Sequence, residues 1–265
     1  MEIGASSACF YPLETEKAFL RIAKLGFAHS EIFFNSRCEL ERPFINELRA
    51  VSKAYGTEVS AVHPYTSASE GYMLFSGYER RFYDTLELYK RYAEAAAELG
   101  AEYLVIHGAK TLREIPAEKY AERFAILNET ARAFGCTAVH ENVVHFVGET
   151  PEFMLLMKSY IGNDFKTVLD IKQARRAGVD PLNFIEAMGS SIVHIHLSDY
   201  NNSCDCLPPS EKGLFSFSSL FTALEGAGFN GRCMIELYSE NFSREEELTE
   251  SAKYLEGILN KIKQG

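Results

Sequence analysis

Four strand-like segments in the second half of the chain each end in a side chain of the kind that binds metal ions. In TAVHENV, KTVLD, IVHIHLSD and RCMIELYS these side chains are Glu141, Asp170, His196 and Glu236. Three carboxylates and one imidazole suit a hard or borderline divalent cation. Without a cation, three clustered carboxylates would repel one another and their pKa values would rise. A polar cap hydrogen-bonded to water is the alternative interpretation of the same residues.

Elements that could position these side chains are visible along the whole chain. Short β-rich runs alternate with longer stretches whose apolar residues recur at helical spacing, such as 85–100 and 117–135. Glycines follow several of the helical stretches, as expected just past a helix end. The expected strands cover residues 2–7, 28–34, 57–63, 101–107, 136–142, 165–170, 191–197 and 232–237.

Eight such strand–helix units predict an α/β fold, a (β/α)8 TIM barrel that forms a single domain over residues 1–265. The 265 residues, 46% of them hydrophobic, suit one large core. A doubly wound open sheet is the alternative, but it would usually carry a glycine-rich phosphate loop after an early strand. The first strand here is followed by SSACFYP, which contains no such motif.

Barrel enzymes place their chemistry at the C-terminal ends of the strands, and every expected strand here ends in a polar residue. Side chains two positions apart in a strand share a face. The residues two positions before five of these ends are apolar, which predicts a packed barrel interior beneath a polar pocket; they are Ala61, Val105, Val139, Val168 and Met234. His194 lies one layer below His196 and is expected to be a hydrogen-bonded core residue. The polar ends are Ser6 or Ser7, Glu31, His63, His107, Glu141 with Asn142, Asp170, His196 with Asp199, and Glu236.

Charge and composition narrow the classes of partner. The formal net charge of −10 disfavours nucleic acid, because phosphate contacts need clustered Lys and Arg. No apolar stretch approaches the length of a membrane span and no signal peptide is visible, so we expect a cytoplasmic protein with no membrane contact. The six cysteines are expected to be reduced, and the C-x-C pair Cys204 and Cys206 to be ordinary loop residues.

Motifs in strand order resemble the xylose isomerase-like superfamily, the sugar-phosphate isomerases and epimerases that share a barrel with endonuclease IV. They are AVHPY, VIHG, AVHEN, VLDIKQARRAG, IVHIHLSD, LPPSEKG and MIELYS, and they span essentially the whole chain. The resemblance implies one divalent cation, often manganese, with zinc, cobalt or magnesium as alternatives. It implies that Glu141, Asp170, His196 and Glu236 bind the metal and that Glu141 and Glu236 move protons at a carbon beside a metal-bound carbonyl.

By the same resemblance, His63, His107, Gln173 and Asn142 are expected to bind the substrate. The chain departs from the family pattern at two points. Gln173 stands where many members have a histidine, and no histidine follows Asp199, so the third zinc site of the endonuclease pattern is missing. His63 and His107 with Glu141 still match a first zinc site, which leaves a two-metal centre open.

The leading functional hypothesis is therefore a metal-dependent isomerase or epimerase of a small sugar, ketose or polyol derivative. Alternatives are a lyase of the inosose dehydratase type, an apurinic endonuclease and a non-catalytic sugar-binding protein. A homo-oligomer is compatible with the sequence. The segment 66–80 is read as a loop that forms a lid or a subunit contact. Lys172, Arg175 and Arg176 are read as a solvated helix start, with phosphate binding as the alternative.

Overall fold

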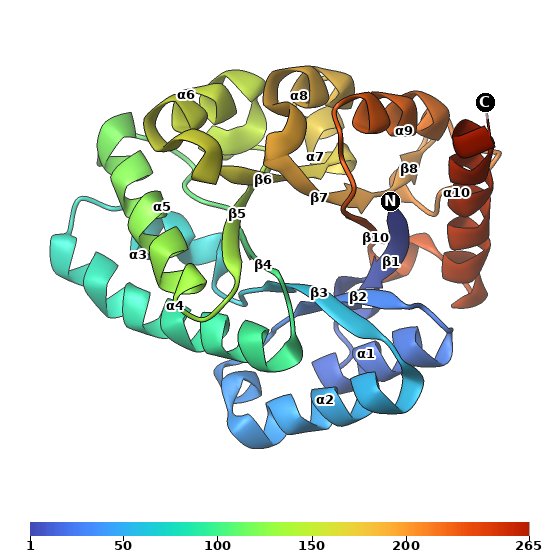
Figure 1. The fold of residues 1–265 in the computed structure, drawn as a ribbon, viewed down its shortest axis with the longest axis horizontal. Helices are drawn as coiled ribbons and strands as arrows, with labels where there is room; N and C mark the ends of the chain where they lie inside the picture. The colour runs from blue at the N-terminus through green and yellow to red at the C-terminus, as the bar shows by residue number, and fades with distance from the viewer. Residues whose placement is uncertain (265) are drawn as a thin grey trace.

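Eight parallel strands close into a barrel at the centre of the molecule (Figure 1). The computed structural model describes residues 1–264, and its strand order around the barrel is β1-β10-β7-β6-β5-β4-β3-β2. The TIM-barrel prediction and all eight expected strands are confirmed, and each strand is shorter than expected by one to three residues in total. The strands are β1 (Glu2–Ser6), β2 (His29–Phe33), β3 (Glu58–His63), β4 (Tyr103–Ile106), β5 (Thr137–Glu141), β6 (Lys166–Asp170), β7 (Ile192–Leu197) and β10 (Arg232–Ile235).

A ring of helices surrounds the strands (Figure 1). Two short helices, α3 (Glu70–Met73) and α7 (Ile171–Arg176), lie in the connections after β3 and β6. Short 3-10 turns cover Ser7–Phe10, Arg37–Leu40, Ser67–Ser69, Val147–Glu149, Gly162–Asp164, Gly189–Ser191 and Ser239–Asn241. The longer helices are α1 (Thr15–Lys24), α2 (Arg42–Tyr55), α4 (Glu79–Leu99), α5 (Ala117–Arg132), α6 (Pro151–Ile161), α8 (Pro181–Met188), α9 (Phe217–Gly226) and α10 (Glu246–Gln264).

Local sequence explains where several helices begin and end. Pro151 and Pro181 open α6 and α8, where a missing N–H has no cost. Gly56 and Gly100 close α2 and α4 in the left-handed region, with φ of 72° and 77°. Only glycine adopts that conformation without strain from a Cβ atom. These signals fix the points at which the chain turns back towards the barrel.

The barrel interior holds the apolar layer that the alternation predicts. Ala61, Val105, Val139 and Val168 form one buried cluster, each at most 1% exposed. Each lies two residues before a polar strand end, so a packed apolar layer lies directly beneath the polar side chains. The much larger apolar cluster fills the space between the outer face of the barrel and the helices.

Two connections at the mouth are more ordered than the sequence suggests. The segment 66–80 contains α3, and its Glu70 is fully buried, accepting hydrogen bonds from the Gly108 N–H (2.6 Å) and the Tyr89 hydroxyl (2.7 Å). That carboxylate ties the segment to α4 and to the connection after β4, so the segment is not the loop that the sequence suggested, and its role as a lid or a subunit contact stays a prediction.

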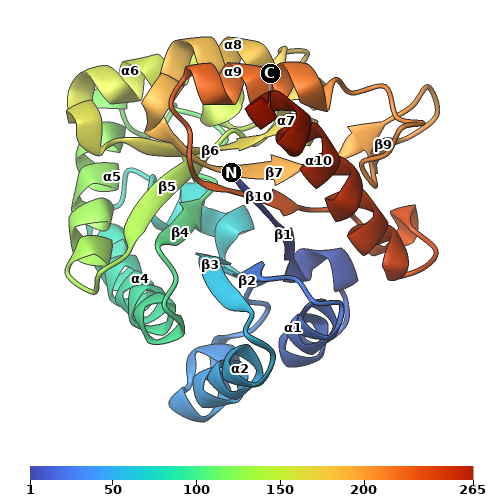
Figure 2. The ribbon, with the colours of Figure 1, turned by 45° about the vertical axis from the view of Figure 1, so that its right-hand side comes forward.

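The second ordered connection follows β7. It forms a small antiparallel hairpin, β8 (Asp199–Tyr200) with β9 (Asp205–Leu207), which extends beyond the barrel at the right of Figure 2. Cys204 and Cys206 lie here as free thiols, and Cys206 is buried within β9. No helix within residues 1–264 is long and apolar enough to cross a membrane.

Candidate metal centre

The four side chains singled out from the sequence meet at the mouth of the barrel. Glu141 and Asp170 are the last residues of β5 and β6, and Asp170 pairs in register with His196 of β7. Glu236 follows β10, where its backbone N–H donates to the Leu197 carbonyl of β7 at 3.0 Å. Strand order therefore places the four residues on neighbouring strands of one arc.

Three carboxylate oxygens surround one nitrogen of His196. Nδ1 of His196 lies 3.1 Å from Oε1 of Glu141, 3.5 Å from Oε2 of Glu236 and 3.8 Å from Oδ2 of Asp170. Ligand atoms bound at about 2.1 Å to one cation lie roughly 3.0–3.4 Å apart, so small movements would complete a coordination sphere. Oδ2 of Asp170 and Oε2 of Glu236 are buried and accept no hydrogen bond from residues 1–264. The donor set therefore fits a divalent cation.

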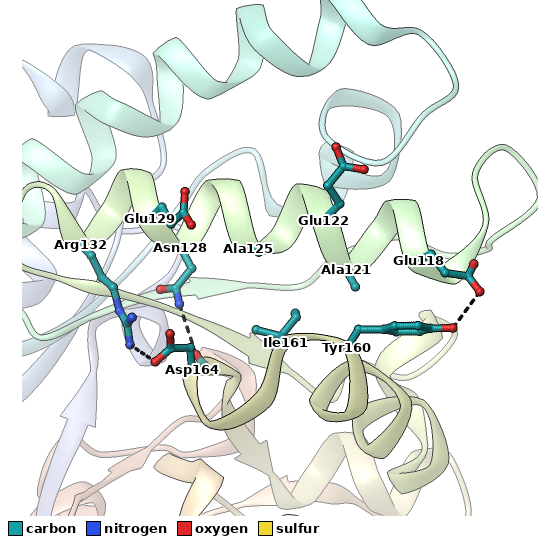
Figure 3. A pocket seen from close by; sticks show the side chains of 10 residues that line it. All are labelled: Glu118, Ala121, Glu122, Ala125, Asn128, Glu129, Arg132, Tyr160, Ile161 and Asp164. Atoms are coloured by element: carbon teal, nitrogen blue, oxygen red, sulfur yellow. Dashed lines mark hydrogen bonds and ion pairs between the residues drawn. The ribbon is translucent and has the colours of Figure 1, made fainter.

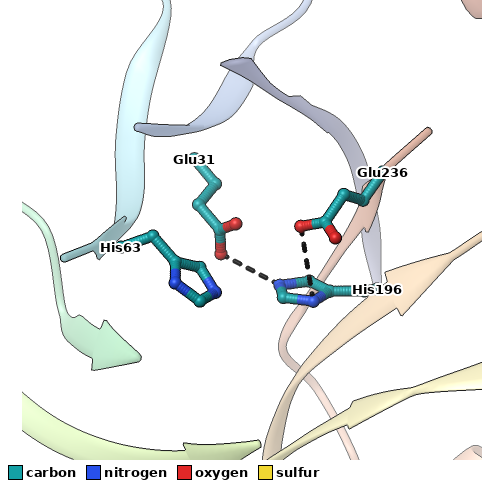
Figure 4. Close-up of side chains that lie close together, drawn as sticks. All are labelled: Glu31, His63, His196 and Glu236. Atoms are coloured by element: carbon teal, nitrogen blue, oxygen red, sulfur yellow. Dashed lines mark hydrogen bonds and ion pairs between the residues drawn. The ribbon is translucent and has the colours of Figure 1, made fainter. Parts of the chain in front are cut away.

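Glu31 fixes the orientation of His196 from below. Its Oε2 lies 3.1 Å from Nε2 of His196 and 2.9 Å from Nε2 of His194, and all three side chains are at most 1% exposed. Figure 4 shows Glu31 and Glu236 approaching the His196 ring from different sides. A carboxylate that accepts the Nε2 proton leaves the Nδ1 lone pair for a metal. His194 is hydrogen-bonded and buried, as expected from the sequence.

Burial and charge work against each other in this cluster. Burial alone would raise the pKa of Glu141, but the imidazoles of His107 and His196 hold it well below its usual value. Burial alone would lower the pKa of His196, yet Glu236, Glu31 and Glu141 raise it well above the ordinary value. The pKa of Asp170 is raised by burial and by the neighbouring carboxylates, with Lys172 opposing that shift. Metal binding at Nδ1 would displace a proton that these carboxylates stabilise.

His63 and His107 stand on the far side of Glu141. Their Nε2 atoms lie 3.4 Å and 2.9 Å from Oε2 of Glu141, and the Phe33 ring stacks on His63 at 4.6 Å. The three residues offer ligand atoms within 4.8 Å of one another, as a second cation would need. Glu141 can thus bridge two positions, one at each of its oxygens.

Comparison with known proteins identifies the family of this barrel. The sequence profile of the xylose isomerase-like TIM barrel family matches residues 19–258. The chain belongs to this family. An uncharacterized protein of Mycobacterium leprae (strain TN) is 27% identical over 98% of both chains, and the fructoselysine 3-epimerase of Escherichia coli O157:H7 is 21% identical over 89% of this chain and 90% of its own.

A solved structure shows the same fold over nearly the full length of the chain. The D-psicose 3-epimerase of Clostridium cellulolyticum H10, solved with D-tagatose, superposes with a TM-score of 0.81 at 18% identity, over 98% of this chain and 99% of that one. This likeness shows a shared barrel fold.

Two expected substrate contacts of this xylose isomerase-like protein have other partners. Asn142 is fully buried, its side-chain NH2 donates to the Asp170 carbonyl (3.0 Å), and its side-chain oxygen accepts from the Asp170 N–H (2.7 Å). Both polar atoms of Asn142 thus join the end of β5 to β6, and its expected role as a substrate contact stays a prediction. Gln173 uses its side-chain oxygen to accept from the Val144 N–H at 3.2 Å, which leaves only its NH2 group for a ligand.

The three basic residues after β6 contact different partners. The ammonium of Lys172 is buried, 3.3 Å from Oδ2 of Asp170 and 3.2 Å from Oε1 of Glu236. Arg176 pairs with Asp205 at 2.6 Å, and the Arg175 guanidinium covers the Tyr200 ring at 3.1 Å. The interpretation of Lys172 as part of a solvated helix start is wrong, because it belongs to the cluster. Glu31 was likewise absent from the expected ligand set, although its position at a strand end signalled it.

The Asp199 carboxylate accepts hydrogen bonds from the backbone of the connection after β7. Its Oδ1 accepts from the N–H groups of Tyr200 (2.7 Å) and Phe215 (3.0 Å), and its Oδ2 accepts from that of Ser210 (3.3 Å). A Cβ atom at Gly213 would collide with this carboxylate. Asp199 thus organises the connection that follows β7.

The centre is nearly closed. His107 (18%) and Glu236 (14%) are its most exposed side chains, while those of Glu141, Asp170 and His196 are at most 3% exposed. A ligand would therefore meet His107 and Glu236 first. A separate cavity of about 360 Å³ lies outside the barrel between α5 and α6, and none of its lining residues belongs to the centre (Figure 3).

Proposed function

We propose that this protein is a divalent-metal-dependent isomerase or epimerase of a small ketose or polyol derivative. The observation that carries the proposal is the pairing of two glutamates, Glu141 and Glu236, on either side of His196 with Asp170 as a third ligand. The names of two relatives, a fructoselysine 3-epimerase and a D-psicose 3-epimerase, support a sugar substrate with a carbonyl group. Manganese is the metal we expect, with zinc, cobalt or magnesium as alternatives.

A bound divalent cation would supply electrophilic stabilisation for the substrate oxygens beside the reacting carbon. The Gln173 N–H donates a hydrogen bond to Asp170, and Glu31 is hydrogen-bonded to His196. These contacts hold Asp170 and His196 in place, so their proposed role is to bind the metal. Glu141 and Glu236 are proposed to transfer protons as well as to bind the metal. Two carboxylates on opposite faces of one carbon can act in turn as base and acid.

Glu236 and Glu141 differ in solvent exposure, so they would exchange protons with water by different routes. Glu236 is 14% exposed, so a proton that it takes from the substrate can exchange with water. Glu141 is 3% exposed and its Oε2 lies 2.9 Å from Nε2 of His107, which is 18% exposed. Proton exchange at Glu141 therefore runs through His107. His63 and His107 are proposed to bind the substrate, or a second cation, on this side.

Isotope exchange tests the proposal. Purified enzyme loaded with manganese is incubated in D2O with a panel of ketoses, inososes and hydroxypyruvate, and the products are analysed by NMR. We expect deuterium at the carbon beside the carbonyl together with an isomerised or epimerised product. Exchange that survives thorough chelation would exclude the metal-dependent mechanism. A dehydrated diketone or enol product would identify a lyase instead.

A further inference from the structure

Lys172 brings an ammonium group to the cluster, and the proposed proton transfers do not use it. It is the second residue after Asp170, in the first turn of α7, and its side chain is 3% exposed. Its Nζ lies 3.2 Å from Oε1 of Glu236 and 3.3 Å from Oδ2 of Asp170, and 5.1 Å from the centre of the Tyr238 ring. A buried ammonium needs such partners, because an unpaired buried charge is strongly destabilising.

The position of Lys172 leaves one oxygen of Glu236 free. Oε1 accepts a hydrogen bond from the ammonium, so Oε2 faces Nδ1 of His196 at 3.5 Å and accepts no hydrogen bond from the described residues 1–264. Asp170 is held similarly, because its Oδ1 accepts from the Gln173 N–H at 2.9 Å and its Oδ2 lies between Lys172 and His196. Each carboxylate therefore presents a single oxygen to the position of a cation.

We propose that Lys172 is a positioning residue and a resident cation of the metal centre: it keeps Asp170 and Glu236 in ligand geometry before the metal binds, and it weakens divalent cation binding by charge repulsion. The inference rests on the proposed function, since it concerns the metal centre of that function. It adds a role for a side chain that touches two ligands at once.

Distance makes the repulsion large. A cation bound to Oδ2 of Asp170 at about 2.1 Å would lie no more than about 5.4 Å from Nζ of Lys172, given the 3.3 Å between Nζ and that oxygen. Like charges this close inside a protein repel strongly, and water screens a buried pair poorly. Burial also prevents the ammonium from moving away into solvent. Replacing it with a neutral group should therefore tighten metal binding and destabilise the metal-free protein, whose carboxylates lose their counter-charge.

The test compares K172M and K172Q with the wild type in full-length protein. K90M is the matched control, because Lys90 pairs with Glu87 on the exposed face of α4. The affinity for Mn²⁺ is measured by competition with a fluorescent chelator, and thermal unfolding is measured in EDTA and in excess Mn²⁺. We expect both Lys172 variants to bind Mn²⁺ at least tenfold more tightly than the wild type. In EDTA they should unfold at a lower temperature, and Mn²⁺ should raise their melting temperature by more than it raises that of the wild type. K90M should match the wild type.

General damage to the site, or the loss of positioning alone, would weaken metal binding, so a gain in affinity identifies the charge repulsion as the larger effect, and the lower melting temperature in EDTA reports the positioning in the metal-free protein. Unchanged or weaker binding in both variants, with a wild type that binds Mn²⁺, overturns the inference and leaves the proposed function standing. A wild type that binds no divalent cation overturns the proposed function itself.

A measurement on the wild type covers the case in which the variants do not fold. In protein labelled with ¹⁵N-lysine, a buried and paired ammonium should give an Nζ–H signal that exchanges slowly with water. We expect one such signal to shift with Mg²⁺ and to disappear with Mn²⁺, as its proximity to the cation demands. The absence of any metal-sensitive ammonium signal would refute the inference.

Discussion

Replacing Glu31 with glutamine should weaken metal binding without touching a ligand. Glu31 is fully buried and its Oε2 faces two imidazole nitrogens, 2.9 Å from His194 and 3.1 Å from His196. A glutamine oxygen in the position of Oε2 can still accept from both rings, but the side chain carries no negative charge, so both hydrogen bonds become weaker. His196 then loses the anion that fixes its tautomer and ring angle.

The size of the expected loss in metal affinity follows from the effect of such carboxylates in other metalloproteins. Removing the partner of a metal-binding histidine typically lowers metal affinity about 10–100-fold, which corresponds to roughly 1.4–2.7 kcal/mol. A hydrogen bond to a charged group contributes about 1.5–3 kcal/mol and a neutral one about 0.5–1.5 kcal/mol, so the loss of the charge that both imidazoles face accounts for a change of this size. We therefore expect E31Q to bind Mn²⁺ about 10–100-fold more weakly than the wild type.

Chelator competition would measure this affinity, and circular dichroism would establish that E31Q is folded. Ser6 provides the matched control, because its hydroxyl donates to the other oxygen of Glu31 at 3.3 Å. S6A removes one long hydrogen bond and keeps the negative charge, so its effect should be several-fold smaller. If folded E31Q bound Mn²⁺ as tightly as the wild type, the role assigned to Glu31 would be refuted.

Three further predictions concern catalysis, metal removal and stability. E141Q and E236Q should each lower kcat/KM by about 10²–10⁴-fold and abolish deuterium exchange into the substrate, whereas activity within a few-fold of the wild type would contradict their proton-transfer roles. Chelation should lower the melting temperature, and Mn²⁺ restored at 100 times its Kd should add about 2.7 kcal/mol to the free energy of unfolding, measurable in urea titrations. Y120F removes the hydroxyl that lies 2.7 Å from Nε2 of buried His140 and should lower the free energy of unfolding by about 1–3 kcal/mol, while Y83F, at a tyrosine that is 52% exposed, should leave it unchanged.

The barrel and its polar mouth could be predicted from the sequence because both depend on strict periodicity. Alternation within each strand put Val139 beneath Glu141 and Val168 beneath Asp170, and the structure has this layer. Strand order then brought the four strand ends to one arc, since successive strands of a barrel are neighbours.

Residues outside the strict pattern were harder to place. Lys172 lies in a helix and reaches the cluster through a long flexible side chain, whose direction no spacing rule gives. Asn142 sits at a strand end like the ligands, but it lies one position past Glu141 and therefore on the other face. Glu70 lies in a segment without clear periodicity, and its burial depends on contacts with Tyr89 and Gly108 that are distant in sequence.

The hydrogen bonds of Asp199 determine whether a further metal could bind beside β7. Its carboxylate is committed to three backbone N–H groups of the connection after β7, and Gly213 leaves room for nothing larger beside it. Restoring a histidine nearby would not recreate a further zinc site, because the aspartate would have to abandon the loop that it folds. A metal site at Asp199 would here require a rebuilt loop as well as a new side chain, because the present loop depends on the oxygens that the metal would need.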